Sequence, residues 1–276
     1  MSRAAKAPRQ PVVLKLGGEL LEQPDDIARV AKGIAALARQ APLVVVHGGG
    51  REIDAALATA GIPKRQVDGL RVTDAPTLDV VVAVLAGAIN TRLVSAVRKA
   101  GGRPVGLTGA DAAVAVVRRA APMTSIAGDT VDLGLVGAPV AGSEPELLRH
   151  LLKAGYTPIV ACIGATRSGE LLNVNADTLA SHLAAALGAR RLVIAGGTAG
   201  VLDEAGQTIP RLTTRAAGAL IRQGVANKGM VAKLEACRTA LRRGVGDVII
   251  ANGRVALFQA MATRDPLGNA CTQVVR

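Results

Sequence analysis

The sequence predicts an α/β protein with a mainly parallel central sheet, and three observations lead to that prediction. Short apolar runs rich in Val, Ile and Leu alternate with longer segments of helical periodicity. Strands separated by helices pair in parallel and are covered by helices on both faces. Glycine clusters follow several of these runs directly, at residues 17–18, 48–50 and 196–197. Ligands bind at the carboxyl ends of parallel strands, so these clusters locate the expected site.

The individual elements follow from the same patterns. Strands are expected at 12–16, 43–46, 104–107, 158–163, 192–195 and 248–251, with hairpins in 112–139. Helices are expected from a cap at Asp25 or Asp26 to Leu37, after Gly50 to a stop at Gly61, from Asp74 to Leu93, at 144–154, from Asp177 to Gly188, at 213–223 and at 229–243. The best boundary between two lobes lies near 188–191, which divides the chain into 1–189 and 190–276.

Composition narrows the classes of function. The 33 Lys and Arg residues outnumber the 21 Asp and Glu residues, which gives a formal net charge of +12. Such a balance suits either nucleic acid or an anionic substrate. The basic residues are scattered, however, and the chain has no Trp, one Tyr and one Phe to stack on bases. We therefore expect an enzyme for anionic substrates rather than a nucleic-acid-binding protein.

The sequence also indicates the compartment. The three cysteines, Cys162, Cys237 and Cys271, are far apart and form no metal-binding spacing, so we expect buried thiols and no resident metal ion. The N-terminal residues lack the apolar segment of a secretory signal, and no apolar run reaches membrane-spanning length. We expect a cytoplasmic protein that does not bind membranes.

The glycine run 48–50 stands between a predicted strand and a helix, where backbone N–H groups can bind an anion. A tight turn that needs only small residues is the alternative. The string HGGG also forms the oxyanion hole of some α/β-hydrolases, but the nucleophile motif G-x-S-x-G is absent. Neither the P-loop motif nor G-x-G-x-x-G occurs, which argues against a P-loop or dinucleotide-binding fold.

Lys15 and Lys233 are the two cations that the sequence singles out. Lys15 lies one residue before the end of an apolar strand and directly upstream of Gly17 and Gly18. An unpaired ammonium is costly to bury, so Lys15 either reaches solvent or faces an anion there. Lys233 falls in the first turns of a helix, where the helix dipole disfavours a cation unless an anionic ligand is near. An ordinary solvated lysine is the alternative.

Polar residues elsewhere complete the candidate set. Asp177 precedes an apolar helix and suits an N-cap, which is compatible with a functional role. Asn173 and Asn175 alternate along an extended segment, so their side chains are expected on one side. Arg71, in a loop before a helix, could bind a carboxylate through two hydrogen bonds or be a surface arginine.

Together these residues resemble the amino-acid-kinase family. The resemblance runs almost end to end and is carried by VVLKLGGELL (12–21), VVVHGGG (44–50), VDGLRVTD (67–74), VLAGAINTRLV (84–94), DLGLVG (132–137), GYTPIVACIG (155–164), LLNVNAD (171–177), GVLD (200–203) and GMVAK (229–233). Each string alone is weak, but HGGG, GLRVT and NVNAD in that order are highly specific.

The resemblance implies a three-layer αβα sandwich with two lobes. Residues 1–189 would bind the acyl amino acid and form a homodimer, and residues 190–276 would bind the nucleotide. Lys15 and Lys233 would stabilise the transferring phosphoryl group, and Asp177 would hold both lysines. The acylated amino acid would be bound by Gly49, Gly50, Arg71 and Asn173. Phosphate and nucleotide would be bound by Gly17, Gly18, Gly48, Gly197, Thr198, Ala199, Gly200, Val201, Leu202, Val225, Ala226 and Asn227.

The implied reaction is phosphorylation of the γ-carboxylate of N-acetyl-L-glutamate, a step of arginine biosynthesis, with ATP and Mg²⁺. That carboxylate is ionised at neutral pH, so no general base is needed and catalysis reduces to positioning and charge neutralisation. Two alternatives stay open: a kinase for aminoadipate or glutamate linked to a carrier protein, and a catalytically weak ligand-binding homologue. Eleven residues precede the first strand, whereas arginine-inhibited members carry a longer N-terminal helix, so we expect no inhibition by arginine.

Overall fold

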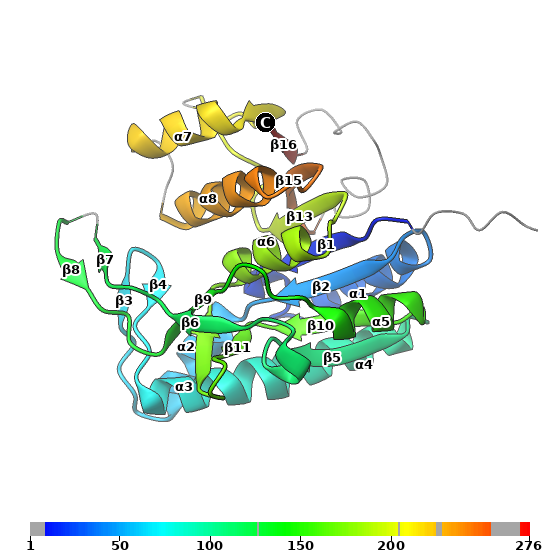
Figure 1. Cartoon of the computed structure of the whole chain (residues 1–276), viewed down its shortest axis with the longest axis horizontal. Coiled ribbons are helices and arrows are strands. Elements are labelled where there is room, and N and C mark those ends of the chain that lie inside the picture. The colour runs from blue at the N-terminus through cyan, green and yellow to red at the C-terminus, as the bar shows by residue number, and fades with distance from the viewer. Residues whose placement is uncertain (1–8, 126, 204, 225–227, 255–270) are drawn as a thin grey trace, which may run out of the picture.

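The computed structural model describes residues 9–125, 127–203, 205–224, 228–254 and 271–276. Its centre is an eight-stranded sheet with the order β14-β16-β15-β13-β1-β2-β10-β5 (Figure 1). The strands are β1 (Val12–Leu16), β2 (Leu43–His47), β5 (Pro104–Thr108), β10 (Thr157–Ala161), β13 (Arg191–Gly196), β14 (Arg211–Thr213), β15 (Asp247–Asn252) and β16 (Cys271–Val275). Neighbouring strands are parallel except β15 and β16. The predicted mainly parallel sheet is confirmed.

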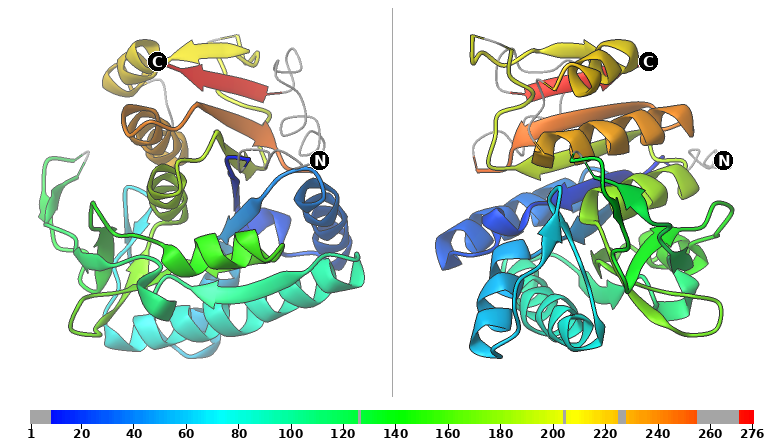
Figure 2. Two further views of the ribbon diagram at one scale, coloured as in Figure 1. Left: turned by 45° about the vertical axis from the view of Figure 1, so that its right-hand side comes forward. Right: turned by 90° about the vertical axis from the view of Figure 1, so that its left-hand side faces the viewer.

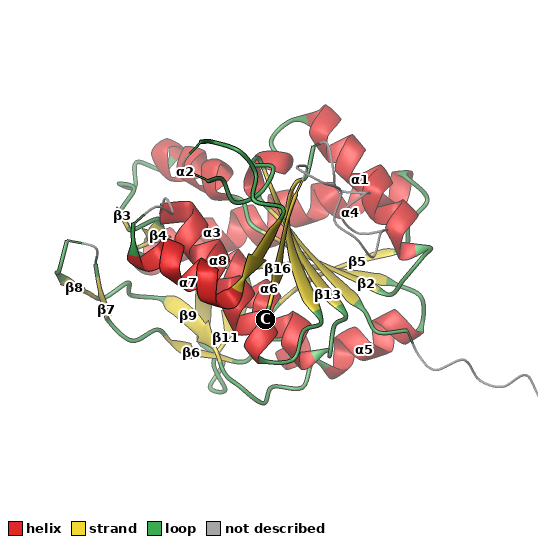
Figure 3. Ribbon diagram, turned by 90° about the horizontal axis from the view of Figure 1, so that it is seen from above, coloured by secondary structure: helices red, strands yellow, loops and turns green. Residues whose placement is uncertain are grey.

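Helices cover both faces of this sheet, as Figure 3 shows. One face carries α1 (Pro24–Ala38) and α4 (Asn90–Lys99), and the other carries α5 (Glu146–Lys153), α6 (Ala176–Ala186) and α8 (Lys228–Arg242). The remaining helices are α2 (Gly50–Thr59), α3 (Ala75–Val82), α7 (Thr214–Arg222), the π-helical segment η2 (Ala83–Ile89) and the 3-10 turns η1 (Gly18–Leu20) and η3 (Asp111–Ala113). The core between these layers consists of buried Val, Leu, Ile and Ala, so the predicted three-layer sandwich is confirmed.

The strands of the C-terminal quarter lie together at one end of the molecule. Figure 2 shows β14, β15 and β16 with α7 and α8 at that end, and β5 with α3 and α4 at the other. Strand β13 meets β1 at the centre, in the register Lys15 opposite Ile194. This register brings the carboxyl ends of an early and a late strand side by side, which places residues far apart in sequence around one site.

Smaller sheets flank the main one. They are formed by β6 (Val117–Arg119), β9 (Val136–Pro139), β11 (Ile163–Ala165) and β12 (Leu171–Val174), by β3 (Gln66–Val67) and β4 (Leu70–Arg71), and by β7 (Met123–Thr124) and β8 (Thr130–Val131). The hairpins expected in 112–139 are confirmed by the antiparallel pairs β6–β9 and β7–β8. The single strand expected over 158–163 is wrong, because β10 ends at Ala161 and β11 starts anew at Ile163.

One further local prediction needs correction. Helix α1 has Gln23 at its N-cap position and Pro24 at its first position, so Asp25 and Asp26 lie inside the first turn rather than at the cap. There they face the positive end of the helix dipole, which is favourable for a carboxylate. The three cysteines are free and buried, as expected.

The segment from Ala75 to Lys99 is a long and largely apolar helix. The elements α3, η2 and α4 form one continuous helix of 25 residues, and its most apolar window of 18 residues has a mean hydropathy of 1.9. The uninterrupted apolar run is only Val80–Ile89, so the expectation that no apolar run reaches membrane-spanning length holds. Core helices of globular proteins reach the same values. In this fold the helix packs against α1, α2 and β5.

Candidate functional site

The site is built around a buried ion pair at the carboxyl end of β1. Lys15 Nζ lies 3.0 Å from Asp177 Oδ1, and each side chain is only 8% exposed. Burial by itself would lower the pKa of Lys15, but the negative charges of Asp177 and then Glu19 outweigh it, so the pKa lies above 10.5. Lys15 is therefore a fixed positive charge inside the protein, and the solvated alternative is wrong.

Asp177 reaches Lys15 because of the way helix α6 begins. The N-cap is Asn175, whose Oδ1 accepts the N–H groups of Asp177 and Thr178 at 3.0 and 3.1 Å. The interpretation of Asp177 as the cap is therefore wrong. Asn175 takes the capping role, which places Asp177 inside the first turn and leaves its carboxylate available to the ammonium.

Two glycine turns meet beside this ion pair. A methyl group placed on Gly18 would lie 2.9 Å from Gly49 Cα and 3.1 Å from Gly50 N, so only glycine fits. A methyl group on Gly49 would collide with Ile89 at 2.1 Å. Backbone N–H groups of the turn 48–50 can thus approach a ligand at the start of helix α2, an arrangement that binds anions.

A small cavity opens next to this turn. Its volume is about 180 Å³, and it is lined by Gly48, Gly49, Gly50, Arg71, Asn173 and Asn175, together with Ile53, Gln66, Gly69, Leu70, Leu85, Val136, Cys162, Val174 and Ala176. The structure thus brings together all four residues predicted to bind the acyl amino acid. The cavity is smaller than the roughly 300–1,000 Å³ of pockets for drug-sized ligands, so it suits a small acid and excludes a nucleotide.

Arg71 is held rigidly at the cavity wall. Its Nη2 donates to Asp54 Oδ1 and to Gly50 O, the latter at 3.3 Å, and its side chain is 7% exposed. Nη1 is buried and has no hydrogen-bond partner in the described part of the chain. A buried donor without a partner is costly, and a ligand carboxylate in the cavity would satisfy it. The surface alternative for Arg71 is therefore wrong.

The two asparagines line the same cavity. Asn173 Nδ2 donates to the buried Thr73 Oγ1 at 3.1 Å, which fixes the amide. Thr73 in turn donates to Arg71 O at 3.2 Å. The expectation that Asn173 and Asn175 lie on one side is confirmed by the cavity they share.

The segment predicted to bind nucleotide, 197–202, follows β13 directly. Thr272 of β16 fixes it, because its Oγ1 accepts the N–H of Val201 at 2.8 Å and would collide with any side chain at Gly200. Leu202 is 46% exposed. Val225, Ala226 and Asn227 lie outside the described residues. Thr272 was not predicted as a site residue, since only the antiparallel pairing of β16 with β15 reveals its place.

Lys233 lies in the second turn of α8. Its Nζ donates to Gly229 O at 3.4 Å, and its Cε would lie 3.9 Å from a methyl group on Gly196, at the end of β13. Asp177 contacts Lys15, whereas no contact between Asp177 and Lys233 is found in the described part of the chain. The predicted role of Asp177 in holding both lysines therefore stays a prediction for Lys233.

His47, in the HGGG string, is a structural residue. Its ring is buried, burial lowers its pKa to about 4, and Asn90 lies 3.0 Å from its Nε2. With Asn90 donating to Nε2, the ring is the Nδ1–H tautomer and donates to Gly48 O at 3.2 Å. This hydrogen bond turns the Gly48 carbonyl toward the ring, so the N–H of Gly49 points the opposite way.

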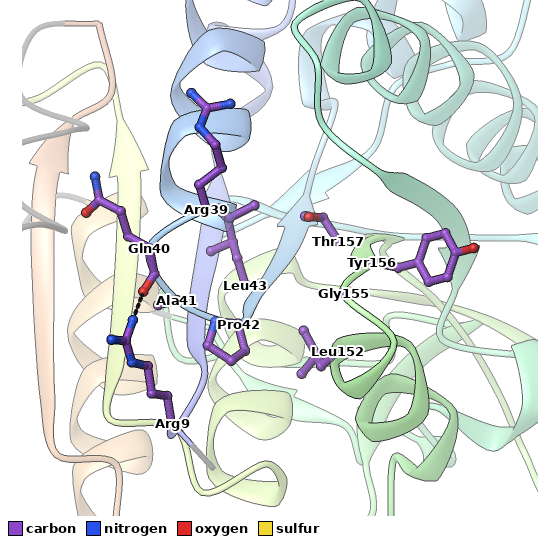
Figure 4. A pocket seen from close by; sticks show the side chains of 11 residues that line it. Arg9, Arg39, Gln40, Ala41, Pro42, Leu43, Leu152, Gly155, Tyr156 and Thr157 are labelled. Carbon is purple, nitrogen blue, oxygen red and sulfur yellow. Dashed lines mark hydrogen bonds between the residues drawn. The ribbon is translucent and has the colours of Figure 1, made fainter. Parts of the chain in front are cut away.

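A larger cavity of about 350 Å³ lies at the opposite, amino end of the sheet. Arg9, Arg39, Leu43, Leu152 and Tyr156 are among its lining residues. Figure 4 shows that Arg39 and Tyr156 extend in different directions, and that Arg9 bonds to the carbonyl of Gln40. No pair of polar groups converges on a ligand position in this view. The smaller cavity beside the glycine turns is therefore the candidate site.

Comparisons with known proteins agree with this geometry. The family model described as the amino acid kinase family matches residues 10–252. An acetylglutamate kinase of Sorangium cellulosum is 44% identical over 85% of this chain and 84% of its own. The solved N-acetylglutamate synthase of Neisseria gonorrhoeae, with coenzyme A and N-acetylglutamate, has a TM-score of 0.81 and 25% identity, over 97% of this chain and 59% of that one. A carbamate kinase of Giardia lamblia shares the fold, with a TM-score of 0.67 and 16% identity over 98% and 99% of the two chains.

The ion pair predicts the effect of Asp177→Asn. Without the carboxylate charge, burial dominates and the pKa of Lys15 falls below 10.5. Titration of ¹³Cε-labelled lysine by NMR measures this pKa. The exposed Lys153 serves as an internal control whose titration does not change. An unchanged Lys15 titration would show that Asp177 does not stabilise the ammonium.

Proposed function

The chain belongs to the amino acid kinase family, and we propose that it transfers the γ-phosphoryl group of ATP to the γ-carboxylate of N-acetyl-L-glutamate, a step of arginine biosynthesis. One observation carries the proposal. A small cavity holds a buried guanidinium with one nitrogen that has no partner among the described residues, and its lining includes a glycine turn and Ala176, the residue before Asp177 of the Lys15–Asp177 pair. A dicarboxylic acid fits this arrangement, because one carboxylate can pair with the guanidinium while the other faces the lysine.

We assign the binding of the acyl amino acid to Gly49, Gly50, Arg71 and Asn173. Arg71 binds a carboxylate that does not react, and the fixed amide of Asn173 hydrogen-bonds a neutral polar group. The reacting carboxylate then lies near Gly48–Gly50. It is an anion at neutral pH, with an ordinary pKa of about 4.3. The nucleophile is thus ready without a general base, in agreement with a neutral, buried His47.

We assign the phosphates of ATP to the turns at Gly17–Gly18, Gly48 and Gly197 and the rest of the nucleotide to 198–202, with 225–227 outside the described residues. The glycine turns suit this role because side chains would fill the space. When bound, Mg²⁺ neutralises phosphate charge, and one or two carboxylates plus phosphate oxygens usually hold it. The described residues contain no cluster of three His, Cys, Asp or Glu side chains. The carboxylate of Glu19 lies between Gly17 and Gly197.

The chemistry that follows is electrostatic. The transferred phosphoryl group spreads negative charge over its oxygens, and fixed positive groups lower the energy of that state. Lys15 supplies one such charge, held in place by Asp177. Lys233, whose side chain extends from α8 toward the end of β13, supplies the second from the other half of the chain. We therefore assign the acyl-amino-acid lobe to 1–189 and the nucleotide lobe to 190–276.

We propose that the protein is a cytoplasmic homodimer. Strand β5 ends the sheet, and no described strand pairs with its outer edge; only 33% of the most apolar window of helix Ala75–Lys99 is buried. The exposed face of this helix carries the small residues Ala83, Gly87 and Ala88, so a second copy of the helix can pack closely against it. A two-fold axis through this face would bury the edge of β5 and the exposed face of the helix in one contact between identical surfaces.

Lys15→Ala tests the catalytic assignment. The expected result is a loss of kcat of about 10²–10³-fold, because one charge that stabilises the transition state is removed. Acyl-phosphate formation, trapped as the hydroxamate, measures the rate. Lys153→Ala, at an exposed lysine, is the matched control. A Lys15→Ala variant that keeps the full rate would exclude Lys15 from the mechanism.

The same assay separates the alternatives. Turnover of free N-acetylglutamate supports the proposal. Turnover only of aminoadipate or glutamate linked to a carrier protein supports the carrier-dependent kinase. Binding of the acyl amino acid without turnover of either substrate supports a ligand-binding homologue.

We also predict that arginine does not inhibit the enzyme. The late segment around 256–261 lacks the string of arginine-inhibited members. The rate is expected to stay constant up to 10 mM arginine, measured at substrate concentrations near KM. Inhibition at low millimolar concentration would contradict this prediction.

The dimer is tested by Ala88→Glu, which places a charge on the exposed face of the long helix. The expected result is a monomer by light scattering after gel filtration, because an interface that buries an unpaired charge is destabilised. Ala28→Glu, on the exposed face of α1, keeps the dimer. A monomeric wild type, or a dimeric Ala88→Glu, would rule out this interface.

A further inference from the structure

Glu19 occupies the space between the two outer glycine turns of the site. Its Oε1 accepts the N–H of Gly197 at 2.9 Å. A methyl group on Gly17 would lie 2.3 Å from Oε2 and 2.6 Å from Oε1, and one on Gly196 would lie 3.0 Å from Oε1. A carboxylate thus fills the gap between the turn after β1 and the turn after β13.

The charges around this carboxylate are nearly balanced. Glu19 raises the pKa of Lys15, after Asp177, which shows that its charge acts on the buried ammonium. The side chain of Lys233 approaches the same point, since its Cε would lie 3.9 Å from a methyl group on Gly196. Two lysines and two carboxylates, Lys15, Lys233, Asp177 and Glu19, therefore lie around the ends of β1 and β13 before any ligand binds. A bare polyphosphate entering here meets Glu19 as a like charge.

We propose that Glu19 makes the site select ATP that carries a divalent cation over free ATP, an inference that rests on the proposed function. A cation bound to the phosphates turns the repulsion into an attraction, because Mg²⁺ accepts carboxylate oxygens directly or through its bound water. The cation-bearing nucleotide is also less negative, so it approaches Glu19 at a lower electrostatic cost. Glu19 is then a specificity-determining residue for the nucleotide.

The contacts of Glu19 suit this role better than a structural one. In the described part of the chain its carboxylate accepts one backbone N–H, that of Gly197, and it lies in a partly exposed position among glycines. Its own backbone carbonyl is held separately, by Arg254 Nη2 at 3.0 Å. The side chain is therefore not needed to hold the turn.

Glu19→Gln removes the charge but keeps the oxygen that accepts the N–H of Gly197. The measurement is the Kd of ATP by calorimetry, with excess Mg²⁺ and with EDTA, at equal ionic strength. The ratio of the two Kd values reports the preference for the cation-bearing form. We expect at least a tenfold smaller ratio in Glu19→Gln than in the wild type, and the same direction in Glu19→Ala.

Glu144→Gln is the matched control, because Glu144 is an exposed carboxylate paired with Arg149 outside the site. Its ratio is expected to equal that of the wild type. A Glu19→Gln ratio within twofold of the wild type would overturn the inference. An equal decrease of both Kd values would also overturn it, because Glu19 would then only compete with the phosphates of ATP for the same N–H group. If the wild type binds ATP under neither condition, the proposed function itself fails, which is a different outcome from an unchanged ratio.

Discussion

The candidate site depends on how a lysine in the middle strand of the sheet keeps its charge. Lys15 is surrounded by β2, β13 and α6, and burial alone would favour the neutral amine. Asp177 offsets that cost, and breaking a buried pair by removing one partner costs roughly 3–5 kcal/mol. The position of Asp177 is set in turn by the Asn175 cap, which starts α6 one residue before it. The Asn175 cap therefore sets where α6 begins, the start of α6 places Asp177, and Asp177 keeps Lys15 charged.

Most of the layered architecture could be read from the sequence, because β-branched runs and helical periodicity are local signals. The glycine turns could be found for the same reason, since each directly follows a strand. The cap of α6 could not be predicted, because Asn175 and Asp177 both suit that position. In the structure Asn175 is the cap and Asp177 pairs with Lys15, a contact that the sequence does not reveal. The place of Glu19 in the site could not be predicted either, because its partner Gly197 is 178 residues away in sequence. The same holds for Asp54, which fixes Arg71 only after β4 folds back onto α2.

The long helix from Ala75 to Lys99 shows why mean hydropathy alone does not distinguish a membrane span from a helix of a globular fold. By hydropathy and length it resembles a membrane span, yet it lies beside the edge strand β5 and one of its faces carries small residues. Apolar residues on a core-facing side and small residues on an outer side give a high mean hydropathy without a membrane. The distinction depends on which face packs against the sheet, and a mean over the sequence discards that information.

The balance of charge at the site has a consequence for catalysis. The chain carries a net charge of +12, yet the two lysines and two carboxylates around the ends of β1 and β13, Lys15, Lys233, Asp177 and Glu19, have charges that sum to zero. A strongly positive site would bind substrate, product and transition state with similar strength, which lowers KM but does not raise kcat. A site that is neutral before binding holds anions only moderately. Fixed lysines then stabilise most strongly the state in which negative charge is densest and best aligned with them, which is that of the transferring phosphoryl group. In the proposed mechanism the carboxylates serve the reaction in two ways: Asp177 fixes the direction of one positive charge, and Glu19 keeps the remaining positive charge from binding every phosphate equally.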